Sequence, residues 1–314
     1  MKIIGFGAVL WDDIKDKQVG SHGDPDNSVC GEQNIGGAVF NVVAHARKLG
    51  FQAYMASAIG DDLLGQKTLD AIRSLDVKTD FIKTVAEPTC VVAVSLDKDG
   101  LPTYSIPEVS SWDAITVNKN DLRLIDNIYF DYFCFGTLEQ RNRVSRETLQ
   151  EILTNCRFKN VYVDLTLRRQ YTKEIIDYSL QHSSIAKMND EEADVVNELF
   201  GFGSKSYENF INRISIEFDI DTVCITTGSA GAHIGSRKEY EFCSGYRVAV
   251  SDTVGAGDAF SAGMLHKLST GANLKDVCDF ANKMGALISA KKSSIPEYDI
   301  ADIGRIGSAR AAEY

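Results

Sequence analysis

Strand-like and helix-like stretches alternate along most of this 314-residue chain. Apolar runs typical of buried strands lie at 2–10, 51–59, 128–135, 161–165, 184–188 and 222–226, and stretches typical of helices lie at 39–49, 64–75, 173–180, 191–199, 207–218 and 277–291. Alternation of this kind predicts βαβ units with right-handed crossovers. The expected fold class is therefore α/β, with a doubly wound, mostly parallel sheet and helices on both faces.

One segment interrupts the alternation. Residues 90–96 alternate like a strand, the pattern breaks at Asp97-Lys98-Asp99-Gly100, and it resumes at 104–106, which predicts a β-hairpin. A loop rich in Asp, Gly, Ser and Asn occupies 15–34, after the first strand. It leads into Gly36-Gly37 and the first helix, which Gly50 is expected to end.

Polar residues collect where the predicted strands end. The first strand is followed by Asp12, and the later ones by Asp164 and Arg168, by Asn189 and Glu192, and by Thr226 and Gly228. Ligands of open α/β sheets bind beyond the carboxyl ends of the strands. We therefore expect these side chains to face one crevice.

Charge and composition exclude several classes of function. The chain has 33 basic and 44 acidic residues, a formal net charge of −11, which argues against a broad nucleic-acid or anionic-membrane surface. No apolar run approaches a membrane span, and the N-terminus does not resemble a signal peptide. Seven cysteines without a CxxC pair indicate free thiols and hence a cytoplasmic protein. Any phosphate must then be bound locally, by loops.

A glycine loop at 251–260 runs straight into a predicted helix. Gly255 and Gly257 flank Ala256, and glycine allows the backbone to turn and approach a ligand closely, so several N–H groups can point outward from the helix start. Asp258 follows at the same place, where it would face a bound anion, and a proton-abstracting role would explain it. The alternative is that Asp258 is only a helix-capping acid and the loop only a tight turn.

The order Asp252-Thr253-x-Gly255-Ala256-Gly257-Asp258-Ala259-Phe260 resembles the signature of the ribokinase-like (PfkB) family of carbohydrate kinases, and within it the fructokinase-like branch. Further matches cover nearly the whole chain. The resemblance implies a single ribokinase-like α/β domain over 1–314, with a small β lid built from segments 12–34 and 88–108. Such lids often pair between subunits, so the resemblance also implies a homodimer.

The same resemblance implies a set of sugar-binding residues. Asp12 corresponds to the family's sugar-binding acid, and Gly36, Gly37 and Asn41 to its Gly-Gly motif, although two glycines before a helix also suit a plain turn. The segment from Asp164 to Arg168 resembles Asp-x-Asn-x-Arg, but Thr166 replaces the Asn, which puts the local hydrogen bonding in doubt. The arginine would contact the sugar or the transferred phosphate; the alternative is a surface ion pair.

Further matches imply a site for ATP and Mg²⁺. Glu192, in an Asn-x-x-Glu match that begins at Asn189, would hold Mg²⁺ through water, whereas Asp190 and Glu191 equally suit a helix start. The remaining nucleotide contacts would come from Thr226, Gly228, Gly231, Gly257 and Asn282, although the segment 226–231 equally suits a β-turn. Many relatives hold a monovalent cation near the position of Asp252, so K⁺ is a candidate here.

The implied reaction is in-line phosphoryl transfer from ATP to a sugar hydroxyl. Asp258 would take the hydroxyl proton, while the N–H groups of Gly255, Ala256 and Gly257 stabilise charge on the phosphoryl group. Neither a P-loop nor a protein-kinase motif set occurs in the sequence.

Fructose is the first expectation for the acceptor. Ribose, a 2-keto-3-deoxy sugar acid and a nucleoside are the open alternatives. Ribokinases usually carry Lys at the position of Ala38, which weakens the case for ribose as the acceptor. The sugar acid would need a cation such as Arg168. The alternative outside enzymes is a silent sugar- or nucleotide-binding regulator, which would be expected to have lost the base or the anion loop. A Rossmann dehydrogenase fits less well, since Gly5-Phe6-Gly7 lacks the third glycine.

Overall fold

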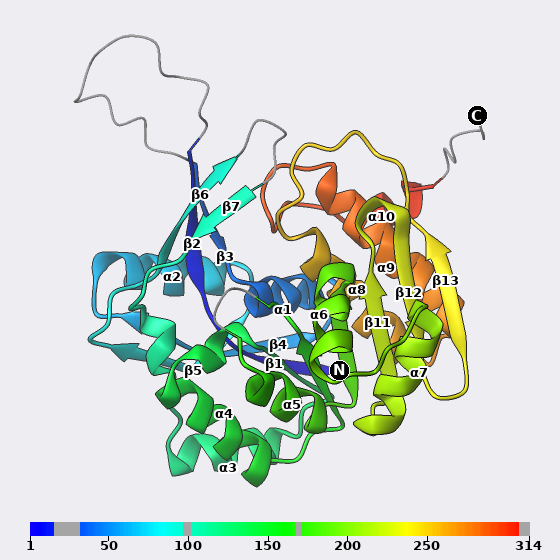
Figure 1. Ribbon diagram of the computed structural model, residues 1–314. Helices are drawn as coiled ribbons and strands as arrows, with labels where there is room; N and C mark the ends of the chain where they lie inside the picture. Colours follow the sequence, from blue (N-terminus) through cyan, green and yellow to red (C-terminus); the bar gives the residue numbers. More distant parts are fainter. Residues whose placement is uncertain (16–31, 97–101, 168–170, 308–314) are drawn as a thin grey trace.

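A large parallel sheet forms the centre of the protein. The computed structural model describes residues 1–15, 32–96, 102–167 and 171–307, and in these the large sheet has nine strands in the order β13-β12-β11-β10-β9-β8-β1-β4-β5 (Figure 1). Their bounds are β1 (Lys2–Phe6), β4 (Gln52–Gly60), β5 (Lys78–Val85), β8 (Tyr132–Gly136), β9 (Asn160–Asp164), β10 (Ile185–Asn189), β11 (Thr222–Thr226), β12 (Gly231–Gly235) and β13 (Tyr240–Ser244). Neighbours from β5 to β11 are parallel, and β12 and β13 continue the edge antiparallel.

Helices cover both faces of this sheet. They are α1 (Ala38–Lys48), α2 (Leu63–Ser74), α3 (Lys119–Ile128), α4 (Arg143–Asn155), α5 (Lys173–Gln181), α6 (Asp190–Leu199), α7 (Tyr207–Glu217), α8 (Ala256–Ser269), α9 (Leu274–Ser289) and α10 (Ile300–Arg305). Short 3₁₀ turns lie at η1 (Ser111–Ala114), η2 (Leu138–Arg141) and η3 (Gly228–Ala230). In the described part of the chain, no helix combines the length and the apolar character that crossing a membrane requires.

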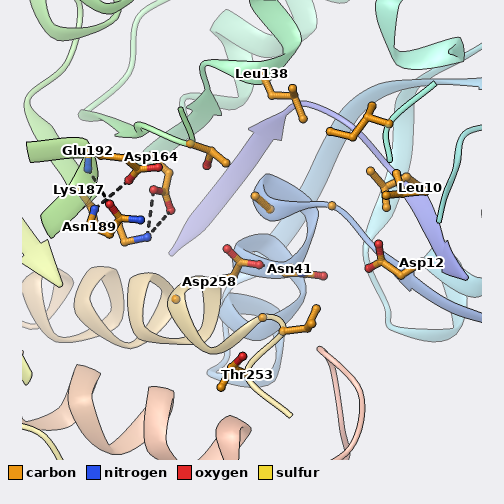
Figure 2. A pocket seen from close by; sticks show the side chains of 18 residues that line it. Leu10, Asp12, Asn41, Leu138, Asp164, Lys187, Asn189, Glu192, Thr253 and Asp258 are labelled. Atoms are coloured by element: carbon orange, nitrogen blue, oxygen red, sulfur yellow. Dashed lines mark hydrogen bonds and ion pairs between the residues drawn. The ribbon is translucent and has the colours of Figure 1, made fainter. Parts of the chain in front are cut away.

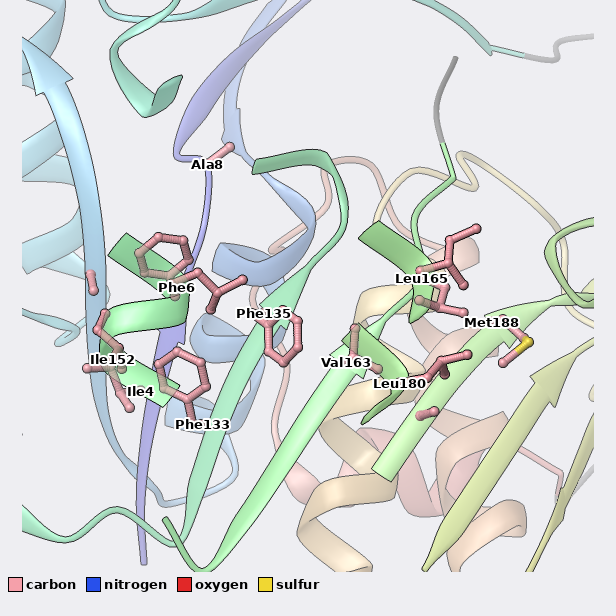
Figure 3. Packing of buried hydrophobic residues seen from close by; sticks show 14 of the residues in the cluster. Ile4, Phe6, Ala8, Phe133, Phe135, Ile152, Val163, Leu165, Leu180 and Met188 are labelled. Carbon is pink, nitrogen blue, oxygen red and sulfur yellow. The ribbon is translucent and has the colours of Figure 1, made fainter. Parts of the chain in front are cut away.

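Alternate residues of each central strand face different cores, as the two-residue period of a strand requires. On β8, Phe133 and Phe135 pack with helices α3 to α7 on one face, where Figure 3 shows them beside Phe6 and Val163. Cys134, between them, packs with α1, α8 and α9 on the other face. The two cores hold the large sheet between helix layers, which confirms the predicted α/β class.

A second, smaller sheet stands apart from the large one (Figure 1). It contains β2 (Leu10–Lys15), β3 (Glu32–Gly36), β6 (Val91–Leu96) and β7 (Pro102–Ser105), in the order β3-β2-β6-β7. The antiparallel pair β6 and β7 is the predicted hairpin. The described parts of segments 12–34 and 88–108 thus contribute to one sheet.

Two predicted strands have the wrong bounds. The run 2–10 is not one strand: β1 ends at Phe6, and the chain crosses to β2 of the small sheet, so Asp12 lies inside a strand rather than just past one. The run 128–135 begins too early, because Asn118 and Asp121 form a capping box that starts α3, and this helix continues to Ile128.

Candidate active site

A cavity of about 360 Å³ opens beyond the carboxyl ends of β1, β8, β9 and β10. The strand order reverses between β8 and β1, the place where open α/β sheets bind ligands. The lining of the cavity comes mainly from both sheets, from α1 and from the start of α8. The lining residues are Leu10, Asp12, Gly37, Ala38, Asn41, Val92, Ile106, Leu138, Asp164, Thr166, Lys187, Asn189, Glu192, Thr253, Val254, Gly255, Gly257 and Asp258.

Figure 2 shows the polar side chains in three groups along this cavity. Lys187, Asp164, Asn189 and Glu192 gather at one end, which we call the cationic end. Asp12 lies at the opposite end beside Leu10, and we call this the acidic end. Asp258 and Asn41 lie between the two ends.

A buried ion pair occupies the cationic end. Lys187 Nζ lies 3.1 Å from both carboxylate oxygens of Asp164. The pair forms because the parallel register of β9 and β10 places the two residues opposite each other. Burial alone lowers the pKa of Lys187, but the charges of Asp164, Glu192 and Asp258 outweigh it and raise this pKa above its ordinary value. Lys187 is therefore a fixed positive charge in the cavity.

The Asp164 carboxylate is held from behind as well. Tyr162 OH lies 3.2 Å from Asp164 Oδ2 and 2.7 Å from Ser261 Oγ, and all three side chains are buried. Ser261 belongs to α8 and donates to Gly257 O at 2.9 Å. This network ties the end of β9 to the first turns of α8.

The glycine loop approaches Lys187 at Gly257, where α8 begins. Gly255 caps α8 with φ of 80°, a left-handed conformation that favours glycine. Gly257 leaves room for a neighbour, since a Cβ there would lie 3.3 Å from Lys187 Nζ. Ala256 does not line the cavity, and its N–H donates to Thr253 O at 3.3 Å. The first-turn amides that follow have no acceptor within the helix, so they suit an anion beside Lys187.

Asp258 occupies the third position of α8, where its side chain meets α1. Asn41 Nδ2 donates to Asp258 Oδ2 at 2.7 Å. The amide oxygen of Asn41 is buried and has no hydrogen-bond partner in the structure. Asn41 thus holds the Asp258 carboxylate while its own carbonyl is left for a donor, such as a hydroxyl group bound in the cavity.

Glycine backbone lies close to Asp12 at the acidic end. A Cβ on Gly36 would lie 2.8 Å from Asp12 Oδ2, although Gly36 itself does not line the cavity. Gly37 has φ of 120°, and a Cβ there would lie 2.3 Å from Ala8 O. Only glycine fits this position, where the chain enters α1 beside the crossing from β1 to β2. The apolar side chains of Leu10, Val92, Ile106 and Leu138 also line the cavity.

Glu192 and Asn189 line the cavity and also start α6. They form a capping box: Asn189 Oδ1 accepts from Glu192 N at 2.7 Å, and Glu192 Oε2 accepts from Asn189 N at 2.8 Å. Glu192 Oε1 accepts from Leu167 N at 2.9 Å. Burial raises the pKa of Glu192 above its ordinary value, against the opposing charge of Lys187. Its carboxylate is therefore fixed in place by two backbone donors, the N–H groups of Asn189 and Leu167.

The donor set at the cationic end fits a water-bound Mg²⁺. Across the described ranges, no group of three or more His, Cys, Asp or Glu side chains is arranged to enclose a metal ion. Mg²⁺ does not require such a cage, because it keeps several waters and takes few protein ligands. Asp164, Glu192 and the Asn189 amide provide the hard oxygen atoms that its waters would contact.

Several residues named from the sequence lie outside this cavity. Thr226 ends β11, while Gly228 and Gly231 bound the turn η3, with φ values of 56° and 125°. Asn282 donates to Cys243 O at 3.0 Å and so ties α9 to β13. Asp252 Oδ1 accepts from Val254 N at 2.9 Å within the glycine loop. Arg168 lies outside the described residues.

No role was predicted from the sequence for Lys187 or Thr253, and Asp164 was named only at a strand end and at the start of a family-like segment, yet all three line the cavity. One signal for Lys187 was present: a lysine in an otherwise apolar predicted strand needs a buried partner. A motif search alone does not reveal which acid that partner is, because the answer depends on the register between two strands.

Comparison with known proteins identifies both the fold and the family. The aminoimidazole riboside kinase of Salmonella typhimurium is 28% identical over 272 residues, 83% of each chain, and a fructokinase of Klebsiella pneumoniae is 26% identical over 74% of this chain and 76% of its own. A putative ribokinase II from E. coli, solved with ATP and Mg²⁺, shares the fold with a TM-score of 0.80 at 17% identity, covering 96% of this chain and 97% of its own. The family model described as pfkB family carbohydrate kinase matches residues 2–300, and the protein therefore belongs to the pfkB family of carbohydrate kinases.

Proposed function

We propose that this protein transfers the γ-phosphoryl group of ATP to a hydroxyl group of a sugar, with Asp258 as the general base. One observation carries the proposal: Asp258 lies between the acidic end and the cationic end of a single cavity. A sugar beside Asp12 and a phosphate beside Lys187 would then meet at the Asp258 carboxylate.

In this proposal the residues of the chain divide the work. Asp258 accepts the proton of the attacking hydroxyl, and the amide of Asn41 holds the carboxylate at the required angle. Lys187 and the first-turn amides of α8, including that of Gly257, stabilise charge on the transferred group. No covalent intermediate with the protein is needed.

ATP and Mg²⁺ are part of the proposal. The related E. coli structure was solved with both, and the donor set at the cationic end fits the metal. Asp164, Asn189 and Glu192 would hold Mg²⁺ through its waters. When bound, the ion would neutralise charge on the ATP phosphates. Nucleotide contacts by Thr226, Gly228, Gly231 and Asn282, and a K⁺ ion near Asp252, stay proposals that rest on the family resemblance.

For the acceptor we propose a small uncharged sugar, with fructose as the first candidate. Among the described residues that line the cavity, Lys187 is the one cation, and it lies far from Asp12, at the opposite end. A sugar acid would leave its carboxylate near Asp12 without a counter-charge, unless Arg168 supplies one. Ribose and a nucleoside stay alternatives, and the similarity to an aminoimidazole riboside kinase supports the latter.

The small sheet is proposed to act as a lid over the acidic end. Asp12 and Val92 belong to this sheet and line the cavity, so its position decides how much water reaches the acceptor. Pairing of two such sheets in a homodimer, and a cytoplasmic location, complete the proposal; the six described cysteines are free thiols, as a reducing compartment favours.

The test is ADP release in the presence of ATP and Mg²⁺ against fructose, ribose, 2-keto-3-deoxygluconate and several nucleosides. Asp258→Asn should lower kcat by at least about a hundredfold, as expected for a lost general base. Asp276→Asn is the matched control, because Asp276 also lies in the first turn of its helix, α9, but outside the cavity. Its kcat should stay within about twofold of wild type.

Two results would contradict the proposal. Equal activity of Asp258→Asn and wild type on the best acceptor would leave Asp258 as a helix-start acid only. Binding of sugar and ATP without turnover on any acceptor would favour the silent regulator.

A further inference from the structure

His45 is the most deeply buried ionisable group on α1, with 0% of its surface exposed, and it does not touch the cavity. Its ring has two partners: Nδ1 lies 2.8 Å from Tyr298 OH, and Nε2 lies 2.9 Å from Ser294 O. A carbonyl oxygen can only accept, so Nε2 carries the proton and Nδ1 accepts from the Tyr298 hydroxyl. In this tautomer both nitrogens of the neutral ring have a hydrogen-bond partner.

The residue that His45 holds lies directly against the glycine loop. A Cβ on Gly255 would lie 2.7 Å from the Cβ of Ser294 and 3.0 Å from its carbonyl oxygen. Ser294 Oγ is also 3.5 Å from Ile35 O, in β3 of the small sheet. The position of Ser294 therefore limits where Gly255, the cap of α8, can lie.

Helix α1 reaches the glycine loop through two residues one turn apart, directly through Asn41 and indirectly through His45. Asn41 and His45 are separated by four positions and so lie on the same face of α1, the face that packs against α8. Asn41 bonds directly to Asp258, and His45 acts through Ser294 on Gly255, the N-cap of α8.

We infer that His45 is a positioning residue for the glycine loop, holding Gly255 in place through the carbonyl of Ser294. The expected effect on kcat rests on the proposed kinase function, whereas the effect on the position of the loop does not. Without the Nε2–H donor, the Ser294 carbonyl is left unsatisfied, the segment around it shifts, and the first-turn amides of α8 lose their alignment toward the transferred group.

Two single variants separate positioning from general stability. His45→Asn loses the donor to Ser294 O but still offers an acceptor to the Tyr298 hydroxyl, whereas Tyr298→Phe removes that hydroxyl and leaves the His45–Ser294 bond intact. Each removes one hydrogen bond of the His45 ring, so both should lower Tm. We expect only His45→Asn to lower kcat, by about tenfold, with the KM of the sugar changed by less than about twofold. His45→Gln, whose amide reaches toward Ser294 O, should recover most of the lost kcat.

Amide hydrogen exchange gives a readout that does not depend on turnover. Peptides covering 251–260 should exchange faster in His45→Asn and at the wild-type rate in Tyr298→Phe. The inference would be overturned if both variants changed loop exchange and kcat to an extent that simply follows the loss of Tm in each. If the wild type phosphorylates no acceptor, the proposed function fails, and the exchange experiment still decides the role of His45. Should His45→Asn not fold, His45→Phe, which keeps a planar ring but loses both hydrogen bonds, replaces it.

Discussion

At the scale of single residues, the buried ion pair of Lys187 and Asp164 is a position where a single substitution should strongly destabilise the fold. The two side chains are only 9% and 4% accessible. Removing one partner of such a pair leaves an uncompensated charge in a poorly solvated site, whereas replacing both is much less costly.

We therefore expect Lys187→Met to lower the free energy of unfolding by roughly 3–5 kcal/mol, and Asp164→Asn in the same chain to restore part of that loss. Arg143→Met is the control, because its ion pair with Glu147 is exposed, and such pairs contribute at most about 1 kcal/mol. Urea denaturation of the three variants gives the comparison. A loss no larger for Lys187→Met than for Arg143→Met would show that the buried lysine is not needed to compensate Asp164.

His45 makes stability depend on pH. Burial lowers its pKa from 6.5 to about 4, opposed by the bond to Ser294 and assisted by the charge of Lys48. The folded state therefore binds fewer protons than the unfolded state between these two values. Stability is complete above pH 6.5 and falls as the pH is lowered towards 4.

The expected loss over this range is about 3 kcal/mol, obtained from the size of the pKa shift. It is measured as the difference between denaturation curves of wild type and His45→Phe at several pH values, since the variant lacks the titrating group. A difference that stays constant from pH 7 to about 4 would mean that the His45 pKa is not lowered on folding.

At the scale of secondary-structure elements, the start of α1 depends on a glycine for two separate reasons. Gly37 needs both a positive φ and free space beside Ala8 O, whereas Gly50, just after the same helix, has φ of 95° and no atom within 4 Å of a built Cβ. A substitution at Gly50 therefore tests backbone strain alone, whereas one at Gly37 tests strain together with steric contact.

Gly50→Ala should cost about 1 kcal/mol of unfolding free energy, the usual penalty for a left-handed residue with a Cβ. Gly37→Ala should cost clearly more, and it should also weaken sugar binding, because α1 and the crossing into β2 would have to separate. Thermal denaturation and the KM of the sugar measure the two effects. Equal penalties at both glycines would show that the contact with Ala8 relaxes freely.

Most elements of the large sheet could be predicted from the sequence, because apolar runs separated by helical stretches carry a strong signal. The strands β5, β12 and β13 were not predicted. β12 reads Gly-Ala-His-Ile-Gly, and glycine at both ends resembles a turn more than a strand. Its extended form depends on antiparallel pairing with β11, a tertiary contact that local sequence does not encode.

At the scale of the whole molecule, the site could be predicted in part. The sequence motifs named Asp12, Asn41, Asn189, Glu192 and Asp258, and all five line the cavity. The hydrogen bond between Asn41 and Asp258, 217 positions apart, could not be predicted, nor could the register that pairs Lys187 with Asp164. Such contacts depend on how α1 packs against α8 and how strands align, and neither is written in a local pattern.

The long separation between Asn41 and Asp258 has a consequence for synthesis on the ribosome. All described strands of the large and small sheets, and α1, precede the glycine loop in the chain, so they emerge before it. A nascent or prematurely terminated chain can thus form much of the sheet but lacks the proposed base. Under the proposed function, ATP is not consumed by unfinished molecules, and phosphoryl transfer begins only when translation has passed α8 and that helix has docked on α1.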